Sequence, residues 1–190
     1  MNMSKFTYLM NVSLDGFVAR PNGELDWTVV NEELHTFFND QQREVSAHLY
    51  GRRLYEVMRY WETAEQDASH TSYELDFARV WKNIPKIVFS TTLEQVHGNA
   101  TLVKENVADE LRALKQKPGK NFDVGGPTLA ATCTDLGLID EYGLVVHPVV
   151  LGSGLPFFPT RDDMLNLQLI ETRRFQCGVV YLRYHTNSSS

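Results

Sequence analysis

The sequence predicts one α/β domain built on a largely parallel sheet that ends in antiparallel strands. Short apolar runs alternate with amphipathic stretches through the first two-thirds of the chain, which is typical of strand–helix–strand units. The last third indicates two or three strands in succession with no helix between them. No repeat and no Pro/Gly/Ser-rich linker divides the 190 residues. We therefore expect a single domain over residues 1–186 and a disordered polar tail at 187–190.

Composition narrows the class of protein. At 43% hydrophobic residues the chain can bury a full core without disulfides or metal, and Cys133 and Cys177 are expected to be reduced and buried. A net charge of −6 argues against a general nucleic-acid or membrane-surface binder. No apolar run is long enough to span a membrane, and the N-terminal stretch is too interrupted for a signal peptide. These features favour a cytoplasmic protein with a small-molecule substrate.

The alternating elements follow in order along the chain. Buried strands are predicted at residues 6–12, 48–50, 86–90 and 121–126. Helices with one apolar stripe are predicted at 32–47, 52–59, 73–84, 106–117 and 127–136. The closing strands are predicted at 139–150, 165–175 and 179–185. Asn106 can cap its helix, while Pro127 begins the next one and Gly137 follows its end.

Two turns at predicted strand ends suit an anion. Gly125 and Gly126 separate a strand from the helix that begins at Pro127, so that the backbone could approach a phosphate near the positive helix end. A plain tight turn is the alternative. Arg52 and Arg53 follow Gly51 at a helix start, where cations are disfavoured unless an anion pairs with them. A solvated charged face is the alternative there.

A third turn follows the strand at 86–90. Ser90 and Thr91 could donate to a phosphate or a ribose, although Ser and Thr after a strand are also ordinary loop residues. None of the three turns is decisive alone. Their order along the chain is more specific than any one of them.

Six segments follow one another in a characteristic order, namely SLDGFVA (13–19), GELDW (23–27), YGRRLYE (50–56), IVFSTTL (87–93), DVGGPTL (123–129) and GLIDEYGLVVHPVVLGSGLPFF (137–158). Read in this order, they resemble the dihydrofolate reductase superfamily, and most closely its branch related to the RibD C-terminal domain of riboflavin biosynthesis. The last segment is the most specific. The resemblance covers nearly the whole chain, from about Phe6 to Arg183.

The resemblance implies an eight-stranded, mostly parallel mixed sheet with helices on both faces, a homodimer, and NADPH lying across the strand ends. It implies cofactor contacts by position at Val18, Ala19, Gly51, Arg52, Arg53, Ser90, Thr91, Gly125, Gly126, Thr128 and Leu129. It places Asn11, Asp15, Trp27 and the start of the helix near Glu32 beside the substrate.

Two departures from the family bear on the cofactor. Leu54 stands where relatives often have threonine, and Thr91 where many have a basic residue suited to the 2′-phosphate of NADPH. Arg52 or Arg53 could supply that charge, and otherwise NADH could serve as well. Cofactor choice is therefore less constrained than cofactor binding.

The proton donor is the second open question. Asp15 is the leading catalytic candidate, with a turn-forming role before Gly16 as the equal alternative. Glu32 and Glu33 more often act as charges in a first helical turn. The six histidines show no spacing typical of a metal site, so no metal is expected.

The sequence thus favours an NAD(P)H-dependent reductase that transfers a hydride to a small heterocycle, such as a pyrimidine or pterin, or to a carbonyl or imine. A non-catalytic nucleotide-binding or regulatory relative is the alternative, motivated by Leu54 and by the lack of a clear proton donor. Consecutive C-terminal strands would leave an apolar edge unless paired, which also favours a homodimer.

Overall fold

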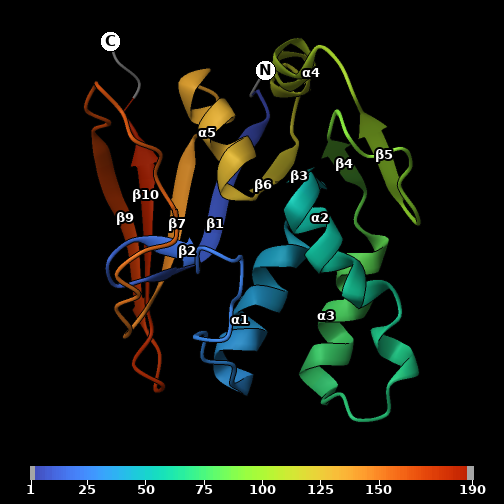
Figure 1. Cartoon of the computed structure of the whole chain (residues 1–190), viewed down its shortest axis with the longest axis vertical. Coiled ribbons are helices and arrows are strands. Elements are labelled where there is room, and N and C mark those ends of the chain that lie inside the picture. Colours follow the sequence, from blue (N-terminus) through green and yellow to red (C-terminus); the bar gives the residue numbers. More distant parts are fainter. Residues whose placement is uncertain (1–2, 188–190) are drawn as a thin grey trace.

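The computed structural model describes residues 3–187, and the predicted tail at 187–190 lies outside this range except for Asn187. One eight-stranded sheet forms the centre of the molecule, in the order β5-β4-β3-β6-β1-β7-β10-β9 (Figure 1). Its strands are β1 (Lys5–Ser13), β3 (Ala47–Gly51), β4 (Lys86–Phe89), β5 (Ala100–Val103), β6 (Asn121–Gly125), β7 (Glu141–His147), β9 (Leu167–Arg174) and β10 (Val180–Thr186). A separate two-stranded sheet pairs β2 (Phe17–Ala19) with β8 (Leu155–Pro156).

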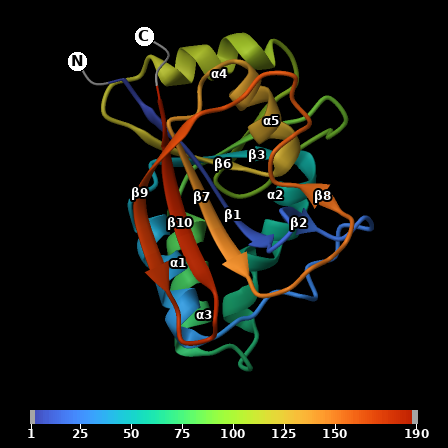
Figure 2. The same ribbon diagram turned by 90° about the vertical axis from the view of Figure 1, so that its left-hand side faces the viewer.

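The pairing confirms the predicted mixed sheet. The six strands from β5 to β7 pair in parallel, whereas β10 lies antiparallel to both β7 and β9. Figure 2 shows β10 and β9 at the C-terminal edge. The helices are α1 (Glu32–Arg43), α2 (Arg52–Met58), α3 (Ser72–Asn83), α4 (Val107–Lys115) and α5 (Pro127–Asp135), with two 3₁₀ turns at Arg59–Glu62 and Ala64–Gln66.

Helices cover both faces of the sheet because adjacent strand residues point to opposite sides. Leu49 packs in the cluster that includes Leu111 of α4 and Leu129 of α5. The next residue, Tyr50, packs instead with Phe77 and Trp81 of α3. A further cluster on the α3 side joins α1 to β7 and β10. The two faces therefore bury separate apolar cores.

Several local expectations need correction. The first helix ends at Arg43 and not at residue 47, because Glu44 caps it and Ala47 already belongs to β3. Asn106 occupies the N-cap position with φ +55°, but its side chain makes no capping bond. Strands β2, β5 and β8 were not predicted, since β2 and β8 have only three and two residues and none of the four residues of β5 is buried. Cys177 is only partly buried, although both cysteines are free.

Pro127 and Gly137 bound α5 as expected. Pro127 is its first residue, and Gly137 follows the helix with φ +66°. Within residues 3–187, no helix is both long enough and apolar enough to cross a membrane.

Candidate active site

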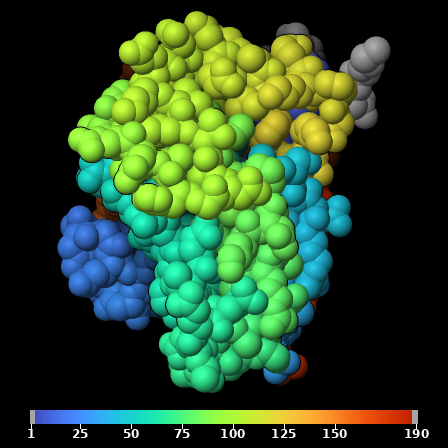
Figure 3. Space-filling model, turned by 90° about the vertical axis from the view of Figure 1, so that its right-hand side faces the viewer, coloured from blue at the N-terminus to red at the C-terminus, as the bar shows by residue number. Residues whose placement is uncertain are grey.

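A groove of about 730 Å³ lies at the carboxyl ends of the parallel strands. Three of its turns follow strand ends, after Gly51 of β3, Phe89 of β4 and Gly125 of β6. In Figure 3 the segment before α1 (blue) stands at one edge of the molecule, beside the surface around α2 and the 3₁₀ turns (cyan to teal). The groove is lined by all but one of the residues with predicted cofactor contacts, namely Val18, Ala19, Gly51, Arg52, Arg53, Ser90, Thr91, Gly126, Thr128 and Leu129.

The exception is Gly125, which packs behind the groove. A Cβ atom there would lie 2.5 Å from side-chain atoms of both Tyr50 and Leu54, so only glycine fits. Gly125 therefore lets α2 approach β6 and does not line the groove. Leu54 of α2 occupies this contact.

Gly126 is the N-cap of α5 and has φ +94°, a conformation that favours glycine. Its carbonyl accepts the first helical hydrogen bond, from the N–H of Ala130 (3.0 Å). The N–H groups of the first turn lack helical partners, and Thr128 adds a hydroxyl beside them in the groove. This turn offers donors and a positive helix end to an anion.

The two arginines at the start of α2 have different surroundings. Arg52 Nε donates to Glu56 Oε1 (2.9 Å), and its Nη1 donates to Thr92 Oγ1 (2.9 Å). Arg53 forms no ion pair with any of residues 3–187. Arg53 therefore brings an unbalanced positive charge to the groove, whereas Glu56 offsets that of Arg52.

Ser90 and Thr91 have different surroundings in the turn after β4. Ser90 is buried, and its Oγ accepts hydrogen bonds from the N–H groups of Thr92 (3.2 Å) and Leu93 (3.1 Å), which shapes the turn. Thr91 is exposed in the groove. Of the two, Thr91 has the freer hydroxyl.

The far end of the groove is apolar. Val18 and Ala19 of β2 lie there with Met10 and Leu155. Gly154 presses against β2, because a Cβ atom at this position would lie 2.1 Å from the carbonyl oxygen of Ala19. The glycine-rich loop before β8 is thus fitted closely to the strand that lines the groove.

The carboxylate of Asp15 ties its own loop to the loop before β8. Its Oδ1 accepts from Ser13 Oγ (2.7 Å) and from the N–H of Leu151 (3.1 Å), and its Oδ2 accepts from the N–H of Gly152 (2.7 Å). These bonds, that of Ser13 first, lower the pKa of the Asp15 carboxyl. These three bonds make Asp15 a clamp between two loops, and its expected catalytic role stays a prediction.

Asn11 and Trp27 meet at a histidine that the sequence did not single out. The N–H of Val29 donates to His147 Nδ1 (3.1 Å), so the ring proton sits on Nε2, which donates to Asn11 Oδ1 (2.9 Å). Trp27 packs edge-on against the same imidazole at 5.4 Å. Burial lowers the pKa of His147 and keeps the ring neutral. The three residues lie together beside the groove rather than in its lining.

The acidic pair at the start of α1 behaves as charges in a first helical turn. Glu33 Oε2 accepts from the N–H of Gln176 (2.9 Å), which ties α1 to the loop before β10. Sequence reasoning missed other lining residues, among them Leu25, Val107 and Thr132. Leu25 lies within the GELDW segment but was not singled out, whereas Val107 of α4 and Thr132 of α5 lie outside all six segments.

The fold and the groove define an α/β protein of the dihydrofolate reductase type. A putative riboflavin biosynthesis protein from Shewanella sp. PV-4 superposes with a TM-score of 0.75 at 21% identity, over 97% of this chain and 99% of that one. Dihydrofolate reductase from Enterococcus faecalis, in complex with NADP(H), superposes with a TM-score of 0.64 at 14% identity, over 97% of each chain. At these identities the likeness shows the fold alone.

The particular family follows from the sequence. The model of the RibD C-terminal domain matches residues 5–181, and the chain belongs to this family. "Uncharacterized protein YyaP" of Bacillus subtilis (strain 168) is 36% identical over 180 residues, which are 93% of this chain and 92% of the relative. "Uncharacterized protein YwjB" of the same strain is 29% identical over 167 residues, or 86% and 88% of the two chains.

Proposed function

We propose that this protein is an NAD(P)H-dependent reductase that transfers a hydride to a small heterocyclic, carbonyl or imine substrate. The carrying observation is the convergence of three separate backbone turns, at Gly51, Ser90 and Gly126, on one groove. Its volume of about 730 Å³ lies within the range of roughly 300–1,000 Å³ common for small-molecule and cofactor sites.

The residues of the groove fit a dinucleotide. Gly126 and the first turn of α5 would hold the pyrophosphate, Arg53 a further phosphate, and the apolar end at Val18 and Ala19 the nicotinamide. When bound, such a cofactor supplies the hydride. NADPH is favoured over NADH because Arg53 has no carboxylate partner among the described residues.

The substrate end would be set by Asn11, His147 and Trp27. Since His147 holds the Asn11 carbonyl oxygen, the Asn11 amide N–H groups stay available as donors. Amide donors suit a carbonyl or ring acceptor on the substrate. Because the Asp15 carboxylate is bonded to both loops, we propose that a water molecule brings the proton.

A non-catalytic relative is the second candidate, because the carboxylate of Asp15 accepts three hydrogen bonds that hold loops together. A measurement of turnover distinguishes the two candidate functions. Both would bind the cofactor, but only the reductase would oxidise NADPH in the presence of a substrate.

The test is a titration of the full chain with NADPH and NADH, followed by melting temperature and tryptophan fluorescence. We expect a saturable rise in melting temperature, equivalent to about 2.7 kcal/mol at 100 times the dissociation constant. Oxidation of NADPH is then measured with pterin, pyrimidine, carbonyl and imine substrates. No response to either cofactor at millimolar concentration would overturn the proposal, and binding without turnover would favour the non-catalytic relative.

We further propose a homodimer. β9 is an edge strand of the sheet, and Leu169 and Ile170 on it are exposed (48% and 44%). A long edge with exposed apolar side chains favours pairing with a second copy. A cytoplasmic location agrees with the free cysteines, one of which, Cys133, is fully buried with its pKa raised to about 12 by desolvation.

A further inference from the structure

A second cavity, of about 240 Å³, lies at the opposite end of the sheet, where β1, β6 and β7 begin. The strand register places Thr7 beside Asp123 on one side and beside Glu141 on the other. Paired residues of adjacent strands point to the same face. Two carboxylates therefore flank Thr7 on one face, and the last turn of α1 closes the cavity with Gln41 and Gln42.

Two side chains that line this cavity hold acceptor atoms without a donor. Gln42 and Glu141 are each only 8% exposed. Neither Gln42 Oε1 nor Glu141 Oε2 has a hydrogen-bond partner among the described residues. Buried polar groups are nearly always hydrogen-bonded. Against these two acceptors the lining holds one unpartnered buried donor, Arg183 Nε, so at least one acceptor still lacks an N–H or O–H donor.

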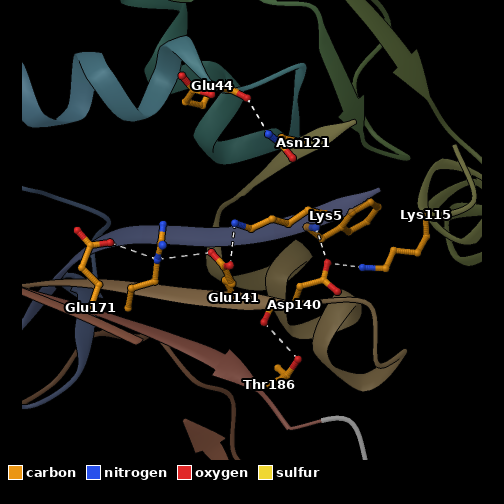
Figure 4. A network of polar contacts seen from close by, with 10 residues as sticks. Lys5, Glu44, Lys115, Asn121, Asp140, Glu141, Glu171 and Thr186 are labelled. Carbon is orange, nitrogen blue, oxygen red and sulfur yellow. Dashed lines mark hydrogen bonds and ion pairs between the residues drawn. The ribbon is translucent and has the colours of Figure 1, made fainter. Parts of the chain in front are cut away.

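The charges around the cavity leave an excess of acid. Lys5 Nζ lies 2.7 Å from Glu141 Oε1, and Arg183 Nε is shared between Glu141 Oε2 (3.7 Å) and Glu171 Oε2 (3.4 Å), without a hydrogen bond to either. Figure 4 shows Lys5 and Glu171 on either side of Glu141.

Two further carboxylates line the cavity, those of Glu44 and Asp123. Asp123 Oδ2 is bonded to His48 Nδ1 (3.0 Å), and neither carboxylate is paired with a lysine or arginine within residues 3–187. With Glu141 they make three acidic side chains against the two basic ones, Lys5 and Arg183, in the lining.

We propose that this cavity binds a small organic cation, an alkylguanidinium or alkylammonium group with a short apolar stem. Its N–H donors would satisfy Gln42 Oε1 and Glu141 Oε2, and its charge would balance Asp123. Leu9, Val45 and Phe122 give the cavity apolar walls for the stem. The site is separate from the groove at the carboxyl ends of the strands and does not depend on the function proposed for that groove.

The first experiment compares two probes of nearly the same shape. The full chain is titrated with methylguanidinium and with its neutral analogue N-methylurea, and backbone amide shifts are followed by NMR. We expect methylguanidinium to saturate with a dissociation constant on the order of 10 mM or tighter, with the largest shifts at Thr7, Gln42 and Asp123. N-methylurea should bind about tenfold more weakly or not at all. Equal responses to both probes, shifts centred on the groove, or no response would overturn the proposal and leave a cavity filled by water.

Variants provide the second experiment. Gln42→Leu removes the unpartnered acceptor, so we expect a higher melting temperature without ligand and at least a tenfold loss of methylguanidinium affinity. Gln116→Leu, at an exposed position after α4, is the control and should change neither. Asp123→Asn should weaken the binding of methylguanidinium but not that of N-methylurea. If loss of the His48 contact prevents this variant from folding, the result for Gln42→Leu decides. Unchanged affinity in Gln42→Leu would refute the site.

Discussion

The two ends of the central sheet hold cavities that are built in different ways. At the carboxyl ends, three backbone turns contribute to the groove, at Gly51, Ser90 and Gly126, each between a strand and the next element. At the amino ends, the second cavity is made by side chains such as Asp123 and Glu141 that project from the strands themselves. Backbone turns offer N–H donors to an anion, whereas the carboxylate and amide oxygens offer acceptors to a cation.

The difference extends to burial. The polar atoms of the groove lie in an open channel, and Thr91 and Arg53 are exposed within it. The acceptors of Gln42 and Glu141 are shut away from solvent. An empty groove therefore costs the fold little, because water hydrates its donors, whereas the amino-end cavity leaves buried atoms unsatisfied. The same sheet thus separates the end proposed to bind an anion from the end proposed to bind a cation.

The largest effect is expected where backbone freedom itself makes the site. Gly126→Val should lower NADPH affinity about 100-fold, close to the loss of one or two charge-assisted hydrogen bonds at roughly 1.5–3 kcal/mol each. The reason is that Gly126 combines φ +94° with a place in the groove lining. Calorimetric titration with NADPH measures the loss.

Gly137→Val is the matched control, at the other end of α5. Gly137 also has positive φ (+66°), but it has open space around it and lies outside the groove. Both variants should lose stability through backbone strain, about 1–2 kcal/mol or more each. Only Gly126→Val should lose NADPH. A similar loss in both variants would show that the affinity follows stability and would remove the groove as the cofactor site.

The contrast between the two ends also explains what the sequence could predict. Each turn of the groove is contiguous in the chain, within residues 50–56, 89–93 and 124–131, so glycines and hydroxyls at strand ends pointed to it. The cavity at the amino ends joins Thr7, Gln42, Asp123 and Glu141 from four elements. Nothing local marks these residues, because their proximity arises only from strand order and register.

Roles proved harder to predict than positions. Asp15 stands in the predicted loop, but its partners Leu151 and Gly152 lie more than 130 residues away, so its engagement could not be foreseen. His147 was passed over because a single histidine shows no pattern, and its contact with Asn11 depends on the pairing of β1 with β7. The alternation of strands and helices, in contrast, is a local property and gave the sheet correctly, apart from the short strands.

A smaller effect is expected at Arg53, which lines the groove and has no ion-pair partner among residues 3–187. Arg53→Ala should weaken NADPH binding about tenfold, as expected for one charge-assisted contact, and should change NADH binding much less. Arg52→Ala should change the ratio of NADPH to NADH affinity less than Arg53→Ala does, because Glu56 already offsets the charge of Arg52. The measurement is the ratio of NADPH to NADH dissociation constants. A larger shift in the ratio for Arg52→Ala would reverse the assignment of the two arginines.

The smallest effect of a substitution is expected at Asp15. At this position a side chain, and not a backbone turn, holds the loops at the carboxyl end of the sheet together. The pKa of Asp15 is lowered, so its loop contacts are complete above its unfolded value near 3.8 and are lost as the pH falls below it through the folded pKa. Asp15→Asn keeps one acceptor but loses the charge. Amide exchange at Leu151 and Gly152 should therefore become several-fold faster at pH 7, and the difference in exchange rate from the unsubstituted chain should narrow below about pH 4.

Asp67→Asn is the control, because that carboxylate holds only its own loop at Ser69. If Asp15→Asn abolished turnover while exchange at Gly152 stayed unchanged, the carboxylate would act on substrate, and the clamp would be the wrong description of this loop.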